Sequence, residues 1–357
     1  MKICYISMTN LFLCPYIKKY QNYIGDRAEV DLIYWDRHGV DEDIKNAVHV
    51  YRYEKAMSEM TGRIRKLVQF IGFRKYVIEI IKKSKYDRII FLHNYMALLM
   101  SGFISKHYKG RYILDIRDYS MENNKFFAAW EKKVINKSGM CVISSEGYKR
   151  FLPEYDYVIS HNDGLIDPDI VQKFRLCEKN NKYIQISFIG LVRFYEQNIK
   201  LMDAFCNDAR FRLGYYGQNS SVLKEYADQQ GYTNMDFHER FDPANTLDFY
   251  EKTQIINNYY GSDSMSLKYA LSNKLYYAAQ LGIPILVCKN TYMEEISSKY
   301  QIGVTIDIND EKCADKLKDY YDNIDWQKFN ENCDEFLTHV SADNDRFGKK
   351  LITFITN

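Results

Sequence analysis

Two basic residues in the second half of the chain stand where a phosphate group could bind. Arg193 follows Gly190 by three residues at the end of an apolar run, and a glycine there lets the backbone approach a ligand closely. Such an arginine can form a forked, charge-assisted pair with a diphosphate. Lys274 ends the segment Ser272-Asn273-Lys274, which opens a helical pattern whose first amides also attract phosphate. The alternatives are a surface salt bridge for Arg193 and a solvated side chain for Lys274.

Polar residues in the first half follow two other apolar runs. His93 comes directly after the run 88–92, and Arg117 and Asp118 come directly after the run 112–116. Open sheets bind ligands at the carboxyl ends of their strands, so we predict that these three side chains take part in catalysis. A carboxylate in such a place can accept a proton from a hydroxyl group. The alternatives are a structural histidine and an internal ion pair, which we favour for Asp115.

The elements that must position these residues form a regular alternation. Short apolar runs of the kind found in buried parallel strands alternate with segments of helical periodicity. The runs are 2–7, 30–34, 49–53, 88–92, 112–116, 140–144, 157–160, 184–189, 212–216, 235–238, 254–257, 283–287 and 304–306, and the clearest helical segments are 198–207, 220–230 and 271–281. This order predicts an α/β protein with doubly wound, Rossmann-like sheets.

Thirteen strands are too many for one ordinary open sheet but suit two. The polar segment around 164–169 is the best boundary. We therefore predict one domain over residues 1–165 and a second over 166–325, facing each other across a cleft that holds the site.

Composition excludes several classes of protein. The net charge of +2 does not favour nucleic acid as a partner. The first residues lack the long apolar centre of a signal peptide, and no apolar run reaches the ~20 residues that span a bilayer. We expect a cytoplasmic location.

The eight cysteines are scattered without a Cys-x-x-Cys pair, which indicates free thiols rather than disulfides or zinc.

The stretch from Gly62 to Tyr86 carries eight basic residues and one acid, Glu79, among interleaved apolar residues. A basic amphipathic segment can lie on an anionic bilayer, where each cation contributes about 1 kcal/mol. This predicts peripheral association with the inner face of the membrane. The alternative is a core-packed helix with a solvated charged face. Nucleic-acid binding is disfavoured because no binding motif accompanies the run.

Five motifs in order then carry a family resemblance. The segment SFIGLVRFYEQNIKLMDAF (187–205) is similar to the strand, Gly-x-x-Arg loop and helix that open the second domain of retaining GT-B glycosyltransferases of capsule, O-antigen, lipopolysaccharide and exopolysaccharide synthesis. VISHNDGLID, FRLGYYG, IINNYYGSDSMSLKYALSNKLYYAAQLGIPILV and YMEEI resemble further motifs of the same family. Together they cover most of residues 157–308, and the first half matches only in its strand and helix rhythm.

The resemblance implies a sugar transfer from a nucleotide-sugar donor to a lipid-linked or soluble glycan acceptor, with retained configuration. It places the acceptor on the first domain beside His93, and it makes residues 326–357 helices that pack back on that domain. Lys274 would neutralise the departing nucleoside diphosphate. Transfer of this kind uses basic groups and helix ends, so we expect neither a metal nor a cofactor. The donor-binding residues would be Gly190, Arg193, Gly217, Ser266, Asn273, Lys274 and Tyr277.

Three positions depart from the family pattern. Glu196 stands where a lysine is usual, and Tyr269 and Tyr277 stand at the places of two glutamates. A tyrosine can donate to a hydroxyl or stack on a ring, but it is no bidentate acceptor. The donor sugar and base therefore cannot be copied from the family. A sugar-nucleotide epimerase and a catalytically silent glycan- or nucleotide-binding partner protein stay open as alternatives.

Overall fold

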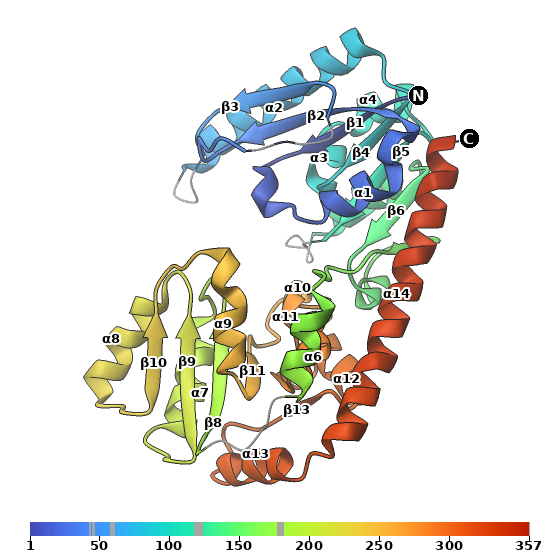
Figure 1. Cartoon of the computed structure of the whole chain (residues 1–357). Helices are drawn as coiled ribbons and strands as arrows, with labels where there is room; N and C mark the ends of the chain where they lie inside the picture. The colour runs from blue at the N-terminus through green and yellow to red at the C-terminus, as the bar shows by residue number, and fades with distance from the viewer. Residues whose placement is uncertain (43, 45–46, 58–60, 118–123, 177–181, 357) are drawn as a thin grey trace. The chain divides into compact units, whose positions relative to one another are not determined.

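The computed structural model covers residues 1–357 and describes all of them except 43, 45–46, 58–60, 118–123, 177–181 and 357 (Figure 1). The chain forms two compact units. Unit 1 contains residues 1–161 and 342–357, and unit 2 contains residues 162–341. The chain therefore passes from one unit to the other twice, first after His161 and again within the last helix.

Unit 1 is built on a seven-stranded parallel sheet with the order β3-β2-β1-β4-β5-β6-β7. Its strands are β1 (Lys2–Ser7), β2 (Glu29–Asp36), β3 (Val50–Glu54), β4 (Arg88–Phe91), β5 (Tyr112–Ile116), β6 (Met140–Ile143) and β7 (Val158–Ile159). Its helices are α1 (Ile17–Ile24), α2 (Arg63–Ser84), α3 (Asn94–Leu99), α4 (Ser101–His107) and α5 (Lys125–Ile135), with 3₁₀ turns at Leu11–Leu13, Gly25–Arg27 and Glu146–Arg150.

Unit 2 has a six-stranded parallel sheet with the order β10-β9-β8-β11-β12-β13. Its strands are β8 (Ile184–Ile189), β9 (Phe211–Tyr216), β10 (Met235–His238), β11 (Ile255–Asn258), β12 (Ile285–Val287) and β13 (Gly303–Thr305). Its helices are α6 (Pro168–Leu176), α7 (Tyr195–Phe205), α8 (Ser220–Gln230), α9 (Thr246–Glu251), α10 (Met265–Tyr269), α11 (Asn273–Leu281), α12 (Tyr292–Lys299) and α13 (Cys313–Asp322), with a 3₁₀ turn at Pro243–Asn245.

Each of the thirteen predicted runs overlaps one of these strands and agrees with it at both ends to within two residues. The predicted fold class, two doubly wound parallel sheets, is confirmed. The physical basis is burial on both faces of the sheet. In β1, for example, Ile3 and Tyr5 pack in the core beneath α1, while the alternate residues Cys4 and Ile6 are also fully buried.

The last helix, α14 (Trp326–Thr356), contributes to the cores of both units. Phe329, Phe336 and Val340 of its first half belong to the core of unit 2, with α6, α11 and α12. Phe347 and Leu351 of its second half lie in the core of unit 1. The expected helix that returns to the first domain is confirmed.

The described cysteines are all free thiols, and six of the seven are buried. The exception is Cys206, which is half-buried. None of the described helices combines the length and the apolar character needed to cross a bilayer.

Truncation of Phe347 tests whether the end of α14 is an integral part of unit 1. Its ring is fully buried and meets Tyr20 edge to face at 5.0 Å. We expect Phe347→Ala to lower the free energy of unfolding by about 3–5 kcal/mol, because the lost burial leaves a cavity. Chemical denaturation monitored by near-ultraviolet circular dichroism would measure the change. Lys349→Ala, at an exposed position of the same helix, should change stability by less than about 0.5 kcal/mol.

Candidate functional site

The order of strands places a switch point in each sheet. In unit 2, β8 lies between β9 and β11, and the connections leave these two neighbours toward opposite edges of the sheet. Ligands of doubly wound sheets bind at such a point, outside the carboxyl ends of the strands. The loop after β8 begins at Gly190 and the loop after β11 contains Tyr260, so these loops form the walls of the predicted donor site.

Gly190 and Gly217 shape the backbone of this edge. Both have positive φ, +121° and +142°. A Cβ atom on Gly217 would lie 1.9 Å from the carbonyl oxygen of Gly190, so Gly217 is required for the close approach of the loops after β8 and β9. A Cβ atom on Gly190 would instead point toward the Lys274 ammonium, 3.9 Å away. Gly190 therefore keeps the space in front of that ammonium open.

Lys274 is a buried cation with only 8% of its surface exposed. Its Nζ donates a hydrogen bond of 2.7 Å to the Tyr260 hydroxyl and lies 4.3 Å from the centre of the Phe188 ring. No carboxylate in the described part of the chain pairs with it. A phenol and aromatic faces offset only part of the cost of burying an ammonium group, so the described residues leave this charge incompletely compensated.

The N-terminus of α11 lies directly beside this lysine. Ser272 is the N-cap, and its hydroxyl accepts a hydrogen bond from the Lys274 amide at 3.3 Å. Asn273, the first residue of the helix, is exposed. Ser266 lies within the short helix α10, half-buried, while Ser264 caps that helix by accepting from the Leu267 amide at 3.1 Å.

Arg193 is exposed at the end of the loop after β8. Its guanidinium lies 5.7 Å from the centre of the Phe194 ring and forms no ion pair with any residue in the described ranges. Phe194 has a left-handed backbone, with φ +59°, and stacks on Tyr260 with ring centres 4.7 Å apart. The same tyrosine that holds Lys274 therefore also supports the loop that carries Arg193. Glu196 is exposed in the first turn of α7 and faces solvent.

Tyr277 lies one turn into α11 and is half-buried. Its ring stacks on Tyr250 with an interplanar angle of 14° and a separation of 4.9 Å. Burial raises the pKa of the Tyr277 hydroxyl, so the group is a neutral hydrogen-bond donor rather than an acceptor anion. A Cβ atom on Gly164 would lie 4.0 Å from that hydroxyl. Tyr269, at the end of α10, is also half-buried.

In unit 1 the switch point lies between β1 and β4, and His93 is at this point. It precedes α3 as its N-cap, with an extended backbone. Its Nδ1 accepts from the Met8 amide at 3.4 Å, which places the imidazole proton on Nε2. That nitrogen lies 3.7 Å from the Cys14 sulfur. Burial, and secondly the positive charge of Arg37, lower the pKa of His93 to about 4, so the imidazole is neutral at physiological pH.

Arg117 is not an open catalytic group in this structure. Its guanidinium is buried and donates to both carboxylate oxygens of Asp115, at 2.9 and 3.1 Å, and to the Ser160 carbonyl at 3.0 Å. The internal ion pair considered for Asp115 is therefore present, and it includes Arg117. Asp118, the third predicted catalytic residue, lies outside the described residues.

The structure also brings forward two residues that sequence reasoning missed. Tyr260 was part of a recognised motif, but nothing in the sequence distinguishes it from its neighbour Tyr259 as the partner of Lys274. Arg37 directly follows β2, a place where a cation after a buried strand could have been noticed. The described residues contain no group of three or more His, Cys, Asp or Glu side chains that could hold a metal ion.

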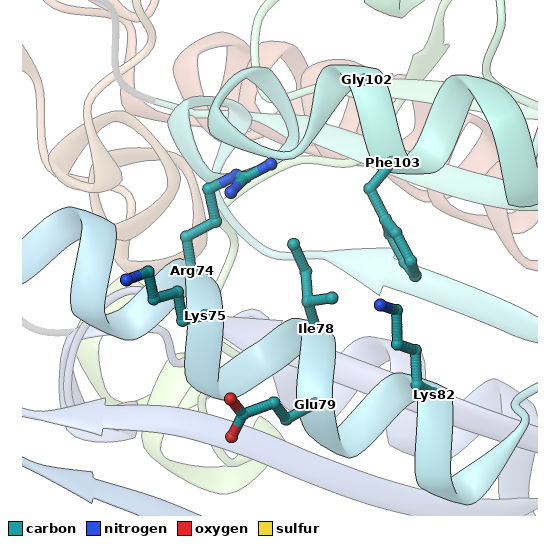
Figure 2. Close-up of a pocket in the computed structure, with 7 residues that line it drawn as sticks. All are labelled: Arg74, Lys75, Ile78, Glu79, Lys82, Gly102 and Phe103. Carbon is teal, nitrogen blue, oxygen red and sulfur yellow. The ribbon is translucent and has the colours of Figure 1, made fainter.

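A shallow groove of about 460 Å³ lies elsewhere in unit 1, between α2 and α4. Figure 2 shows Ile78 of α2 at its centre and Phe103 of α4 opposite. Its lining is basic: Arg74, Lys75 and Lys82 outnumber the one acid, Glu79. The groove continues, at helical spacing, the exposed apolar stripe at the start of α2.

The fold is shared with solved glycosyltransferases. Sucrose-phosphate synthase from Thermosynechococcus elongatus superposes with a TM-score of 0.73 at 10% identity, covering 100% of this chain and 99% of the other. HepE of Anabaena, solved in complex with UDP, has a TM-score of 0.67 at 13% identity, covering 99% of this chain and 100% of the other. WaaG, a glycosyltransferase of lipopolysaccharide biosynthesis, has a TM-score of 0.64 at 10% identity, covering 98% of this chain and 99% of the other. No protein-family model and no curated protein sequence matches the chain.

The pKa of His93 gives a direct test of the site in unit 1. In an unfolded chain histidine binds a proton near pH 6.5, whereas folded His93 resists protonation until about pH 4. Its contribution to stability is therefore complete above pH 6.5 and is lost as the pH falls toward 4. An NMR titration of the imidazole signals should show one histidine, identified by its absence in His93→Gln, that stays neutral down to pH 5. A midpoint near 6.5 would contradict the described environment.

Proposed function

We propose that the protein is a glycosyltransferase that transfers a sugar from a nucleotide-sugar donor to a glycan acceptor. The observation that carries the proposal is the buried Lys274 ammonium, which has no described carboxylate partner and faces the open space above Gly190 at the switch point of unit 2. A donor diphosphate would supply the missing negative charge.

In this proposal the positive groups of unit 2 stabilise the leaving nucleoside diphosphate. Lys274 supplies a full charge in a site of low dielectric, the first amides of α11 add a partial charge, and exposed Arg193 closes on the other side of the phosphates. Lys274 and the amides of α11 are fixed before the sugar bond breaks, so they need little reorganisation as charge develops. Because cationic side chains neutralise the diphosphate, the proposed reaction uses neither a metal nor a cofactor.

The structural relatives support the choice of ligand. HepE has been solved with UDP, with UDP and glucose, and with UDP-glucose. Tyr277 gives this chain a neutral hydroxyl and a ring face where the family has an acidic acceptor, so we infer a donor pocket that differs in how it holds the nucleoside. The base and the sugar are to be found by screening.

Neutral His93 marks the acceptor side of the proposed reaction, at the switch point of unit 1. An imidazole with its proton on Nε2 can donate to a sugar hydroxyl without carrying charge. The family resemblance supports a retaining transfer of a hexose to a lipid-linked glycan in the assembly of a bacterial surface polysaccharide.

We further propose that α2 holds the enzyme on the inner surface of the membrane. One stripe of this helix is apolar and exposed in its first three turns, at Ile64, Leu67, Val68 and Ile71. The same stripe continues at helical spacing into the basic groove of Figure 2, with Lys75, Ile78 and Lys82. An apolar end that enters the lipid and a basic end that meets headgroup phosphates are the two parts of an interfacial helix.

The phosphate contacts are tested first by Lys274→Ala and Arg193→Ala. A thermal-shift screen of UDP-, GDP- and dTDP-sugars identifies the donor, because a ligand of the native state raises the melting temperature. Release of the nucleoside diphosphate from that donor is then measured. We expect each variant to lose on the order of 10²–10³-fold in turnover, the usual effect of removing one electrostatic contact to a developing charge.

Lys224→Ala, which removes an exposed lysine of α8 in the same unit, is the matched control and should keep full turnover. Wild-type rates in both Lys274→Ala and Arg193→Ala would rule out the phosphate role. Conversion of the donor without any acceptor would instead identify an epimerase, and donor binding without turnover against every acceptor would identify a silent binding protein.

Membrane association is tested by Leu67→Gln combined with Val68→Gln. Their side chains are 57% and 62% exposed, so the change should leave stability nearly unaltered while it removes apolar surface from the bilayer contact. We expect co-sedimentation with vesicles of phosphatidylglycerol and phosphatidylcholine to fall at least about tenfold. Leu165→Gln, at a 94% exposed leucine of unit 2, is the control. Equal sedimentation of the double variant and the wild type would overturn the assignment.

A further inference from the structure

Arg37 is a second cation without a described acidic partner, and it lies at the carboxyl edge of the sheet in unit 1. It is the first residue after β2, the strand next to β1 at the switch point. Its guanidinium stacks on Trp35, with the central carbon 4.5 Å from the ring centre, and on Phe70 of α2 at 5.6 Å. Its Nε is buried and has no hydrogen-bond partner.

The three nearest described carboxylates in the sequence are committed to other donors. Asp41 accepts from Arg52 at 2.8 Å. Asp36 accepts from the side chains of Asn10 and Arg52 and from two backbone amides. Glu42 accepts from the Asn10 side chain and from the amides of Leu11 and Phe12. The local acids therefore hold the loops in place and do not neutralise Arg37.

Stacking on the aromatic rings gives the N–H groups of this arginine no hydrogen-bond acceptor. Aromatic faces engage the flat side of a guanidinium, while its N–H groups point outward along the edge. Burial lowers the pKa of Arg37 to about 10. A buried Nε–H with no acceptor costs about 1–3 kcal/mol, so the folded chain holds this charge at a cost in free energy.

His93 completes the arrangement. It lies at the same edge of the sheet, and both residues are anchored to the loop after β1: the Arg37 amide donates to Asn10 Oδ1 at 2.9 Å, and the Met8 amide donates to His93 Nδ1 at 3.4 Å. The positive charge of Arg37 also lowers the pKa of His93. Because the Met8 amide occupies Nδ1, the imidazole presents Nε2–H as a donor. The only described partner of that group is the Cys14 sulfur at 3.7 Å, a weak acceptor that a better one could replace.

We propose that Arg37 and His93 bind an oxyanion, a phosphate or carboxylate group carried by the acceptor substrate. The forked guanidinium supplies the charge and paired donors, and the neutral imidazole adds a third donor. The assignment to an acceptor rests on the proposed function, whereas binding of the anion itself does not. Arg37 would thereby select negatively charged acceptor sugars over neutral ones.

The test uses the whole chain and follows the His93 imidazole signal by NMR at pH 7, with ionic strength held constant by sodium chloride. The probes are inorganic phosphate, glucuronate and glucose. We expect a saturable change of the His93 signal with phosphate, with glucuronate or with both, and none with glucose. In Arg37→Gln the affinity should fall at least about tenfold, as expected when a charge-assisted contact is lost.

Arg65→Gln is the matched control, since it removes an exposed arginine of α2 in the same unit and should leave the response unchanged. Arg37→Lys keeps the charge without the fork and should bind with intermediate strength, which provides a test if Arg37→Gln is unstable. A response to phosphate alone assigns a phosphorylated acceptor, and a response to glucuronate alone assigns an acidic sugar. No saturable response, or an equal one in Arg37→Gln, would overturn the proposal. This measurement does not depend on donor turnover, so a failure of the proposed glycosyltransferase function would be seen separately from a failure of anion binding.

Discussion

Parallel pairing makes the central strands of both sheets bury side chains on two faces, and this constraint organises the rest of the structure. A strand such as β1, with apolar residues in successive positions, leaves little room for polar groups except at its ends. The chain therefore places its chemically active residues in the loops that follow the strands. Because all strands of a sheet point the same way, these loops gather at one edge.

The cations at these edges differ in how their burial is compensated. Arg117 is neutralised by Asp115 and serves the architecture, since a buried ion pair of this kind holds β5 to the strand end near Ser160. Lys274 and Arg37 have no described acid and rest on aromatic faces. Leaving a desolvated cation without a counter-ion costs folding free energy, and such a cost is retained most readily where a ligand provides the missing charge.

Aromatic residues hold these two cations in place although no described carboxylate pairs with them. Tyr260 carries no negative charge. Its hydroxyl accepts a hydrogen bond from the Lys274 ammonium, and its ring stacks on Phe194. The rings of Trp35 and Phe70 hold the Arg37 guanidinium against their faces. In both units the flat aromatic face fixes the position of the charge and leaves its N–H donors without an acid among the described residues.

The sequence alone predicted the two sheets, because their central strands are buried on both faces and need apolar runs such as 2–7 and 184–189. The edge strands β3, β10 and β13 are less buried, and they were found from the regular alternation of strands and helices. The sequence also placed Gly190, Arg193, Lys274 and His93 at strand or helix ends, where local pattern is sufficient. Only the tertiary structure decided which charges are paired. Arg117 and Arg37 look alike in sequence, each following a buried strand and close to an aspartate. The difference arises because Asp115 points to Arg117, while Asp36 is taken by Arg52 of a neighbouring strand, a contact that no local pattern encodes.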